Sequence, residues 1–168
     1  MVGHRFAPKF ICDTISLEVI DMKKFFTICA AVMILLVGNV ACAAESFAVE
    51  VLNLVNAERA KVGAAPLKLA DDMQAAAAIR AREIVSVFSH TRPNGSSCFT
   101  VLKSNGKAYH AENIAAGHAT ASETVNQWMN SSGHRKNILN PVYRELGVGY
   151  VHDGQSEYGH YWVQLFRG

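Results

Sequence analysis

Two histidines and one glutamate are the residues most able to do chemistry together. His90, Glu112 and His134 each lie beside small or polar residues, and Glu112 is 22 positions from either histidine. Two imidazoles and a carboxylate are a normal ligand set for zinc with one open position, and they could equally form a general acid/base pair. Because this spacing is not a local metal motif, the fold must bring the three together. The competing histidines are His110, His118, His152 and His160.

Simpler structural roles are open for the same residues. His134 follows a glycine in a segment that we interpret as a short polar turn, and its ring could brace that turn. Glu112 could be a buried acceptor for backbone N–H groups. The elements that would position these side chains therefore have to be worked out from the rest of the chain.

The N-terminal part of the chain predicts a secretory leader. From Met22, two lysines precede an uncharged, mostly apolar run of about 14 residues and a small-x-small cleavage site at 41–43. That run is shorter than the roughly 20 residues of a membrane-spanning helix. We expect residues 22–43 to be a signal peptide cleaved before Ala44, with no transmembrane span left. Residues 1–21 show no periodicity and are expected to be an over-extended, unstructured start.

The mature segment, residues 44–168, contains a single cysteine. With only Cys98 left, an extracytoplasmic domain would have no internal disulfide, and its stability must come from its core. We expect Cys98 to be a buried helix residue. Acylation at Cys42 is the alternative fate of the leader, although Asn39 stands where a leucine-like residue is expected.

Helices are expected in the first two thirds of this segment. Apolar residues recur at helical spacing, and caps, glycines and prolines mark the ends. Asp71 is the expected cap of the second helix, and a capping box of Thr120 and Glu123 opens the fourth. The predicted helices cover about residues 47–62, 71–88, 96–104 and 120–129. In the second helix, Arg80 is assigned to the solvent side, and Val87 and Phe88 to the buried side. Residues 109–117 have no helical period and are expected to be an extended loop.

The last third of the chain predicts strands. Residues 146–151 alternate with glycines, residues 158–166 are rich in aromatics, and Asp153-Gly154 lies between them. Two such runs joined by a short polar loop are typical of an antiparallel hairpin. Helices first and strands last indicate an α+β layered domain of residues 44–168.

Six motifs, in order from Val51 to Phe166, resemble those of the CAP superfamily (cysteine-rich secretory proteins, antigen 5, pathogenesis-related proteins; SCP-like domain), especially its short bacterial secreted members. They are VLNLVNAERAKVGAAPLKL, FSHTRPNGSSCFTVL, AENIAAGHAT, VNQWMNSSGHRKNILNP, ELGVGYV and YGHYWVQLF. The resemblance implies a three-layer α-β-α sandwich with a small central antiparallel sheet. It also implies that His90, Glu112 and His134 line a central cleft, where many members have a His/Glu/Glu/His tetrad able to hold a divalent metal.

This chain departs from the family pattern at the second glutamate. Three residues after Trp128, where animal and plant members usually place it, stands Ser131. Glu145 is the candidate to replace the missing carboxylate. Asn113 matches the asparagine of the family's glutamate motif and is expected to be a structural hydrogen bonder in the cleft. The family's eukaryotic disulfides are absent, in agreement with the single mature cysteine.

We expect a non-catalytic, secreted or periplasmic binding domain, whose cleft takes a divalent cation, most simply zinc, or a small, lipid or cell-wall ligand. The alternatives are a hydrolase acting on peptide or cell-wall substrates through His90, Glu112 and His134, either with a metal or by acid–base catalysis, and a surface interaction module. No nucleophile stands beside either histidine in a recognised elbow, so no catalytic residue is assigned. The net charge is only +2 and no basic stripe is present, which argues against a nucleic-acid partner. The protein is expected to be a monomer.

Overall fold

The computed structural model describes residues 47–102 and 109–168. Contacts divide the chain into two units, residues 1–38 and residues 39–168, and the second contains every described element. The predicted signal peptide and the predicted over-extended start lie outside the described residues. No helix in the described ranges is long and apolar enough to cross a membrane.

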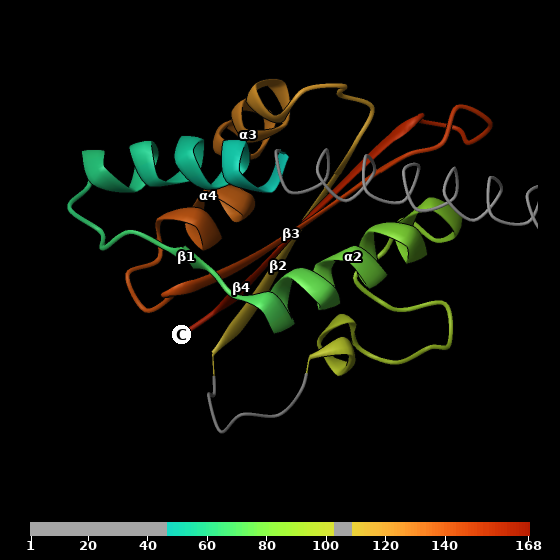
Figure 1. Ribbon diagram of the computed structural model, residues 1–168, viewed down its shortest axis with the longest axis horizontal. Helices are drawn as coiled ribbons and strands as arrows, with labels where there is room; N and C mark the ends of the chain where they lie inside the picture. The colour runs from blue at the N-terminus through green and yellow to red at the C-terminus, as the bar shows by residue number, and fades with distance from the viewer. Residues whose placement is uncertain (1–46, 103–108) are drawn as a thin grey trace, which may run out of the picture. The chain divides into compact units, whose positions relative to one another are not determined.

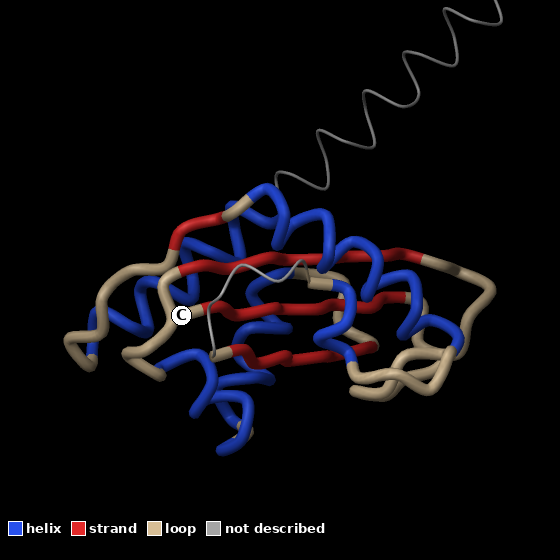
Figure 2. The backbone as a smooth tube through the Cα atoms, turned by 90° about the horizontal axis from the view of Figure 1, so that it is seen from below, coloured by secondary structure: helices blue, strands red, loops and turns tan. Residues whose placement is uncertain are grey.

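A four-stranded sheet in the order β1-β3-β4-β2 forms the middle of the domain (Figure 2). The strands are β1 (Lys68–Leu69), β2 (His110–Ala116), β3 (Glu145–His152) and β4 (His160–Arg167). β3 and β4 form the predicted antiparallel hairpin, and β2 pairs antiparallel with the other side of β4. β1 runs parallel to the first two residues of β3, so the sheet is mixed rather than purely antiparallel.

Helices cover both faces of this sheet (Figure 1). A helix over residues 47–61, α3 (Ala121–Asn130) and α4 (Ser132–Leu139) lie on one side. α2 (Asp71–Ser86) and the short helix η1 (Cys98–Val101) lie on the other. Alternate residues of β4 enter the two cores: Trp162 and Phe166 join the first, and Val163 and Leu165 the second. This confirms the α+β three-layer sandwich, and the core residues within the described ranges lie between 48 and 166.

Two glycines let α2 approach the sheet very closely. A Cβ at Gly147 would stand 2.1 Å from the carbonyl oxygen of Met73, and one at Gly149 would stand 2.1 Å from that of Ala77. Real Cβ atoms do not come so close to another atom, so any larger residue would push the helix away from β3. The glycines of β3 therefore fix the distance between α2 and the sheet.

The prediction of an extended loop at residues 109–117 is wrong, because most of this segment forms the strand β2. Ala111 to Ala115 are buried on both faces, so the strand lacks the alternation that identifies a half-exposed strand. The polar turn expected around His134 is also wrong, since this residue lies in the helix α4. Only Ile138 of α4 is fully buried. The helix therefore has no apolar stripe that could be recognised in the sequence.

Helix ends also differ from the sequence expectation. Ala70, rather than Asp71, occupies the N-cap of α2, and the helix ends at Ser86. Val87 and Phe88 follow the helix and are 42% and 47% exposed, so their assignment to its buried side is wrong. The third helix is only the single turn of η1 within the described residues. The capping box that opens α3 is confirmed, because the backbone N–H of Glu123 donates to the Thr120 hydroxyl.

Candidate functional site

Glu112 is the centre of a buried ionic group at the edge strand β2. Its side chain is turned toward α2, where Arg80 Nε donates to Oε2 at 2.8 Å and Arg80 Nη2 donates to Oε1 at 3.2 Å. His90 Nδ1 lies 2.8 Å from the same Oε1. Glu112 is 5% exposed and Arg80 is fully buried. The sequence prediction that placed Arg80 on the solvent side of its helix is therefore wrong.

The position of Arg80 follows from helical spacing. It lies four residues after Ala76 and four before Ile84, on the stripe of α2 that faces the sheet. A charged residue tolerates that position only when it is paired, and Glu112 supplies the pair from β2. Arg80 also donates to Glu83 Oε2 and to the carbonyl oxygen of Ser89, so it ties the loop that carries His90 to the helix.

The balance of burial and hydrogen bonding keeps Glu112 ionised. Burial alone would raise the pKa of Glu112, but hydrogen bonds from His90 and Arg80, with the positive charge of Arg80, outweigh it and hold the pKa below its usual range. A carboxylate only accepts hydrogen bonds, so the Nδ1 atom of His90 must carry the proton. In neutral His90 the Nε2 atom then keeps its lone pair, which is available to a metal or a proton.

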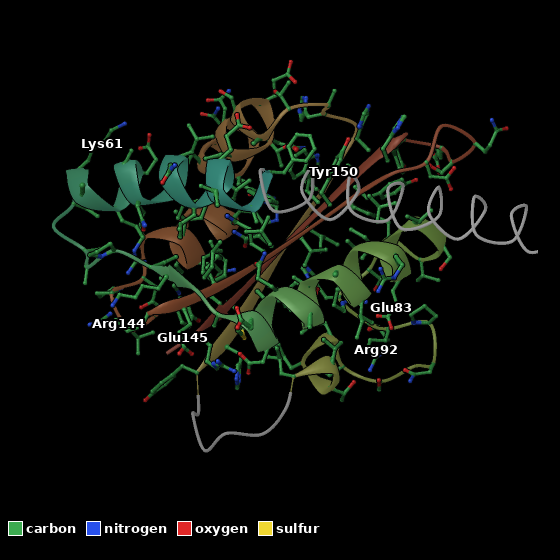
Figure 3. All side chains as sticks on the ribbon, in the orientation of Figure 1. Lys61, Glu83, Arg92, Arg144, Glu145 and Tyr150 are labelled. Carbon is green, nitrogen blue, oxygen red and sulfur yellow. The ribbon has the colours of Figure 1, made fainter. Side chains whose placement is uncertain are left out.

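A second ion pair supports this arrangement from outside. Arg92 donates to both carboxylate oxygens of Glu83, which is also the partner of Arg80 (Figure 3). The chain Glu112–Arg80–Glu83–Arg92 thus alternates in sign and carries no net charge. It fixes the loop on both sides of His90, because Arg92 belongs to that loop and Arg80 binds the carbonyl group just before it.

His134 lies on α4, which packs against the opposite side of β2. Asn113 Nδ2 donates to the carbonyl oxygen of His134 at 3.2 Å, and Asn137 Nδ2 donates to Asn113 Oδ1 at 2.9 Å. These amides hold α4 on the strand that carries Glu112. Asn137 was not singled out in the sequence, where its helical position, one turn after His134, could have been a signal.

The ring of His134 is neutral and has an unused nitrogen. Its Nδ1 atom is buried and has no hydrogen-bond partner among the described residues. Burial lowers the pKa of His134, and the charge of His90 lowers it further. Glu112 is therefore bonded to His90 and not to His134, and the group of metal-capable side chains within 4.8 Å of one another among the described residues includes His90 but not His134.

Cys98 joins the site, although the sequence predicted only a buried helix cysteine. The expectation of burial is confirmed, since Cys98 is 4% exposed at the start of η1. One ring nitrogen of His90, Cys98 Sγ and one oxygen of Glu112 all lie within 4.8 Å of one another. These three residues and Asn137 help to line an open cavity of about 280 Å³. Burial, together with the charge of Glu112, raises the pKa of Cys98 to about 11.

Glu145 and Ser131, the remaining sequence candidates, lie in other surroundings. Glu145 accepts a hydrogen bond from Arg167, which also pairs with Asp72 in the first turn of α2. Figure 3 shows Glu145 at the opposite end of α2 from Glu83. Ser131 lies between α3 and α4 and occupies the N-cap of α4, where its side chain makes no capping hydrogen bond.

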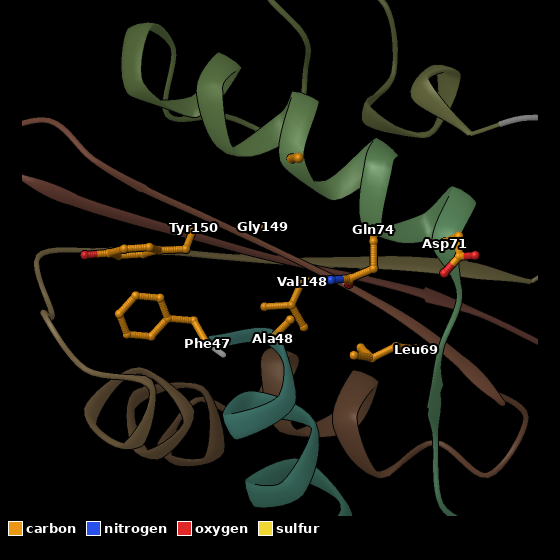
Figure 4. Close-up of a pocket in the computed structure, with 9 residues that line it drawn as sticks. Phe47, Ala48, Leu69, Asp71, Gln74, Val148, Gly149 and Tyr150 are labelled. Atoms are coloured by element: carbon orange, nitrogen blue, oxygen red, sulfur yellow. The ribbon is translucent and has the colours of Figure 1, made fainter. Parts of the chain in front are cut away.

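A larger cavity, of about 440 Å³, lies at the other edge of the sheet (Figure 4). It opens where β3 extends beyond its short pairing with β1, and Phe47, Leu69, Val148 and Tyr150 give it a mostly apolar wall. Neither histidine nor cysteine lines it. Among the described residues, the group of metal-capable side chains therefore lies at β2 rather than at this larger cavity.

Comparisons with known proteins agree with this architecture. A family model described as CAP, the cysteine-rich secretory protein family, matches residues 52–166. The uncharacterised protein YkwD of Bacillus subtilis is 42% identical over 123 residues, which are 71% of this chain and 46% of YkwD. The chain thus spans less than half the length of that curated relative.

Solved structures show the same fold. An extracellular protein from Bacillus anthracis that contains an SCP domain matches with a TM-score of 0.64 and 26% identity, over 74% of this chain and 41% of its own. An outer surface protein from Borrelia burgdorferi matches with a TM-score of 0.62 and 19% identity, over 69% of this chain and 87% of its own. The second likeness concerns the fold alone.

Proposed function

The chain belongs to the cysteine-rich secretory protein (CAP) family, and on that premise we propose that it is a non-catalytic extracytoplasmic binding domain. Its site at β2 takes a divalent cation, zinc first, through His90 and His134. The extracellular description of the Bacillus anthracis relative supports a location outside the cytoplasm, as does the leader expected at residues 22–43.

The observation that carries this proposal is the pairing of His90 with an ionised, buried Glu112. A histidine that ligates a metal generally donates its other ring N–H to a carboxylate, which fixes the tautomer and raises the basicity of the ligating nitrogen. The 2.8 Å contact between His90 Nδ1 and Glu112 provides this arrangement. The Nε2 atom of His90, whose side chain is 58% exposed, is then accessible from solvent.

Glu112 serves in this proposal as a positioning residue. Both of its oxygens already accept hydrogen bonds from Arg80, whose positive charge would repel a cation bound directly to them. His134 supplies the second donor, because its ring is neutral and its buried Nδ1 has no partner. The residues present therefore fit a borderline cation that accepts imidazole nitrogen.

A zinc titration by calorimetry tests this proposal on residues 44–168, which include both described core clusters. We expect a 1:1 complex that is lost in His90→Ala and in His134→Ala and retained in His118→Ala, a histidine outside the site. Far-ultraviolet circular dichroism would verify that the variants are folded. Absence of zinc binding by the wild type, or equal binding by His134→Ala and His118→Ala, would contradict the proposal.

A hydrolase is the second candidate, and the His90–Glu112 pair is the observation in its favour. A neutral imidazole oriented by a carboxylate can act as a general base, whereas ionised Glu112 cannot donate a proton. We would screen peptide and cell-wall substrates with the wild type and with Glu112→Gln. Turnover that the variant loses while its fold is intact would replace the binding proposal with the hydrolase.

A further inference from the structure

His90 and Cys98 are delivered to the site by one closed loop. An antiparallel bridge joins Thr91 to Ser97, and the backbone N–H of Cys98 donates to the carbonyl oxygen of His90 at 3.1 Å. Gly95, at a φ of 83°, makes the reversal between them. The two ends of this loop therefore lie side by side, so His90 cannot be placed in the cavity without placing Cys98 there as well.

The surroundings of Cys98 differ from those of a cysteine that only fills a core. Its Sγ atom lies within 4.8 Å of both a ring nitrogen of His90 and an oxygen of Glu112. Phe99, Ala111 and Asn137 complete the wall of the cavity that these residues share. Neither described core cluster includes Cys98. A sulfur beside an imidazole in an open cavity is a donor pair for a metal rather than a packing contact.

We infer that Cys98 is a ligand of the cation bound at this site, and this inference rests on the proposed function. When the metal binds, a metal–sulfur bond replaces the S–H bond, and one proton is released to solvent. The ligand set is then an imidazole and a thiolate, with His134 as a further donor. Thiolate sulfur selects zinc and cobalt over magnesium and calcium, which take oxygen ligands.

The same contacts argue against Cys98 as a nucleophile. Reactive cysteines lie in electropositive, partly exposed surroundings, whereas this thiol is buried beside the carboxylate of Glu112. Glu112 thus lies beside both side chains of the loop, since it accepts a hydrogen bond from His90 and one of its oxygens is within 4.8 Å of the sulfur of Cys98.

Cobalt(II) absorption spectroscopy tests the inference on residues 44–168, where Cys98 is the only cysteine. We expect a near-ultraviolet thiolate-to-cobalt charge-transfer band that disappears in Cys98→Ser. Loss of a direct ligand should weaken cobalt affinity at least about tenfold, since loss of an outer-shell partner alone costs about 10–100-fold. Ser122→Ala, at an exposed position of α3 outside the site, is the control and should keep the band. Excess magnesium or calcium should not displace cobalt.

The outcomes separate this inference from the proposed function. Cobalt binding without the band, with equal affinity in Cys98→Ser, would overturn the role of Cys98 and leave the histidine site standing. Failure of the wild type to bind either cobalt or zinc would overturn both. X-ray absorption of the zinc-loaded wild type gives a test that needs no variant: a sulfur neighbour at about 2.3 Å supports the inference, and only lighter neighbours at about 2.0–2.1 Å refute it.

Discussion

Replacing Arg80 by methionine should strongly destabilise the domain. The methionine fills much of the same space but leaves Glu112 as a buried carboxylate without its cation. Removing one partner of a buried ion pair typically costs about 3–5 kcal/mol. For a domain of this size, 1 kcal/mol shifts the melting temperature by about 4 °C. We therefore expect Arg80→Met to melt about 12–20 °C below the wild type.

The double variant Arg80→Met/Glu112→Leu separates the buried charge from the lost hydrogen bonds. It removes the carboxylate, so the remaining loss comes from the bonds of Arg80 to Glu83 and to the Ser89 carbonyl and from the bond of His90 to Glu112. At about 1 kcal/mol or less each, the double variant should lose only about 2–3 kcal/mol. Exposed Arg82, on the same helix, gives the control Arg82→Met, for which we expect a change within about 0.5 kcal/mol.

The effect of Arg80→Met should also depend on pH. In the wild type the pKa of Glu112 is lowered, so its contribution to stability is present above the unfolded pKa of about 4.3 and is lost as the pH falls. In the variant, burial raises the pKa of Glu112, so the uncompensated charge destabilises more as the pH rises. The difference between the two proteins should therefore shrink between pH 7 and pH 4.

Urea unfolding measures these differences, because Trp128 and Trp162 are fully buried in the first core and their fluorescence reports the loss of that core when the domain unfolds. Three results would refute the electrostatic argument. The first is a loss of unfolding free energy below about 1 kcal/mol in Arg80→Met. The second is a double variant that is no more stable than Arg80→Met. The third is a difference in unfolding free energy between the wild type and Arg80→Met that stays constant between pH 4 and pH 7.

Three further predictions concern packing, a buried cation and a titration. Gly149→Ala should lower the free energy of unfolding by about 1–3 kcal/mol, because its Cβ would overlap the carbonyl of Ala77. Gly133→Ala, in α4 with no atom within 4 Å of its Cβ, should raise it by about 0.5–1 kcal/mol. Equal melting temperatures of the two variants would disprove this. Arg59→Met should lose about 2–4 kcal/mol in urea unfolding, because Arg59 donates to four carbonyl oxygens; an unchanged midpoint would count against it. The ring of His134 should titrate below pH 6.5 by NMR, since burial and a neighbouring histidine lower its pKa; a midpoint above 6.5 would contradict the described burial.

The fold class and the central pair of the site could be predicted from the sequence, but the partners of that pair could not. The hairpin and the capping box have local signals, and the histidine and glutamate positions carry the family resemblance. Arg80 was assigned to the solvent side because it is charged. The burial of Arg80 and of Arg59 depends on acceptors 32 and up to 84 residues away, which no local pattern reveals.

Cys98 was missed for a related reason. A lone cysteine in a short polar segment has no periodic signal, and its closeness to Glu112 arises only after β2 has paired with β4 and α2 has packed on the sheet. β2 itself could not be recognised, because a strand covered on both faces has no alternation of apolar and polar residues. The elements that were hardest to identify are therefore those that assemble the site.

The close packing of α2 against Gly147 and Gly149 affects how readily this part of the domain opens. At these two glycines the helix backbone touches the sheet directly, with no side chain between them. Amide hydrogens in the middle of α2 and of β3 should exchange with solvent only through global unfolding, while the loop of His90 and Cys98 exchanges by local opening. The permanent charge that orients Glu112 is thus anchored in the slowest-exchanging part of the domain. A cation arriving at β2 would meet a pre-organised carboxylate, and the entropy lost on binding would come mainly from the loop.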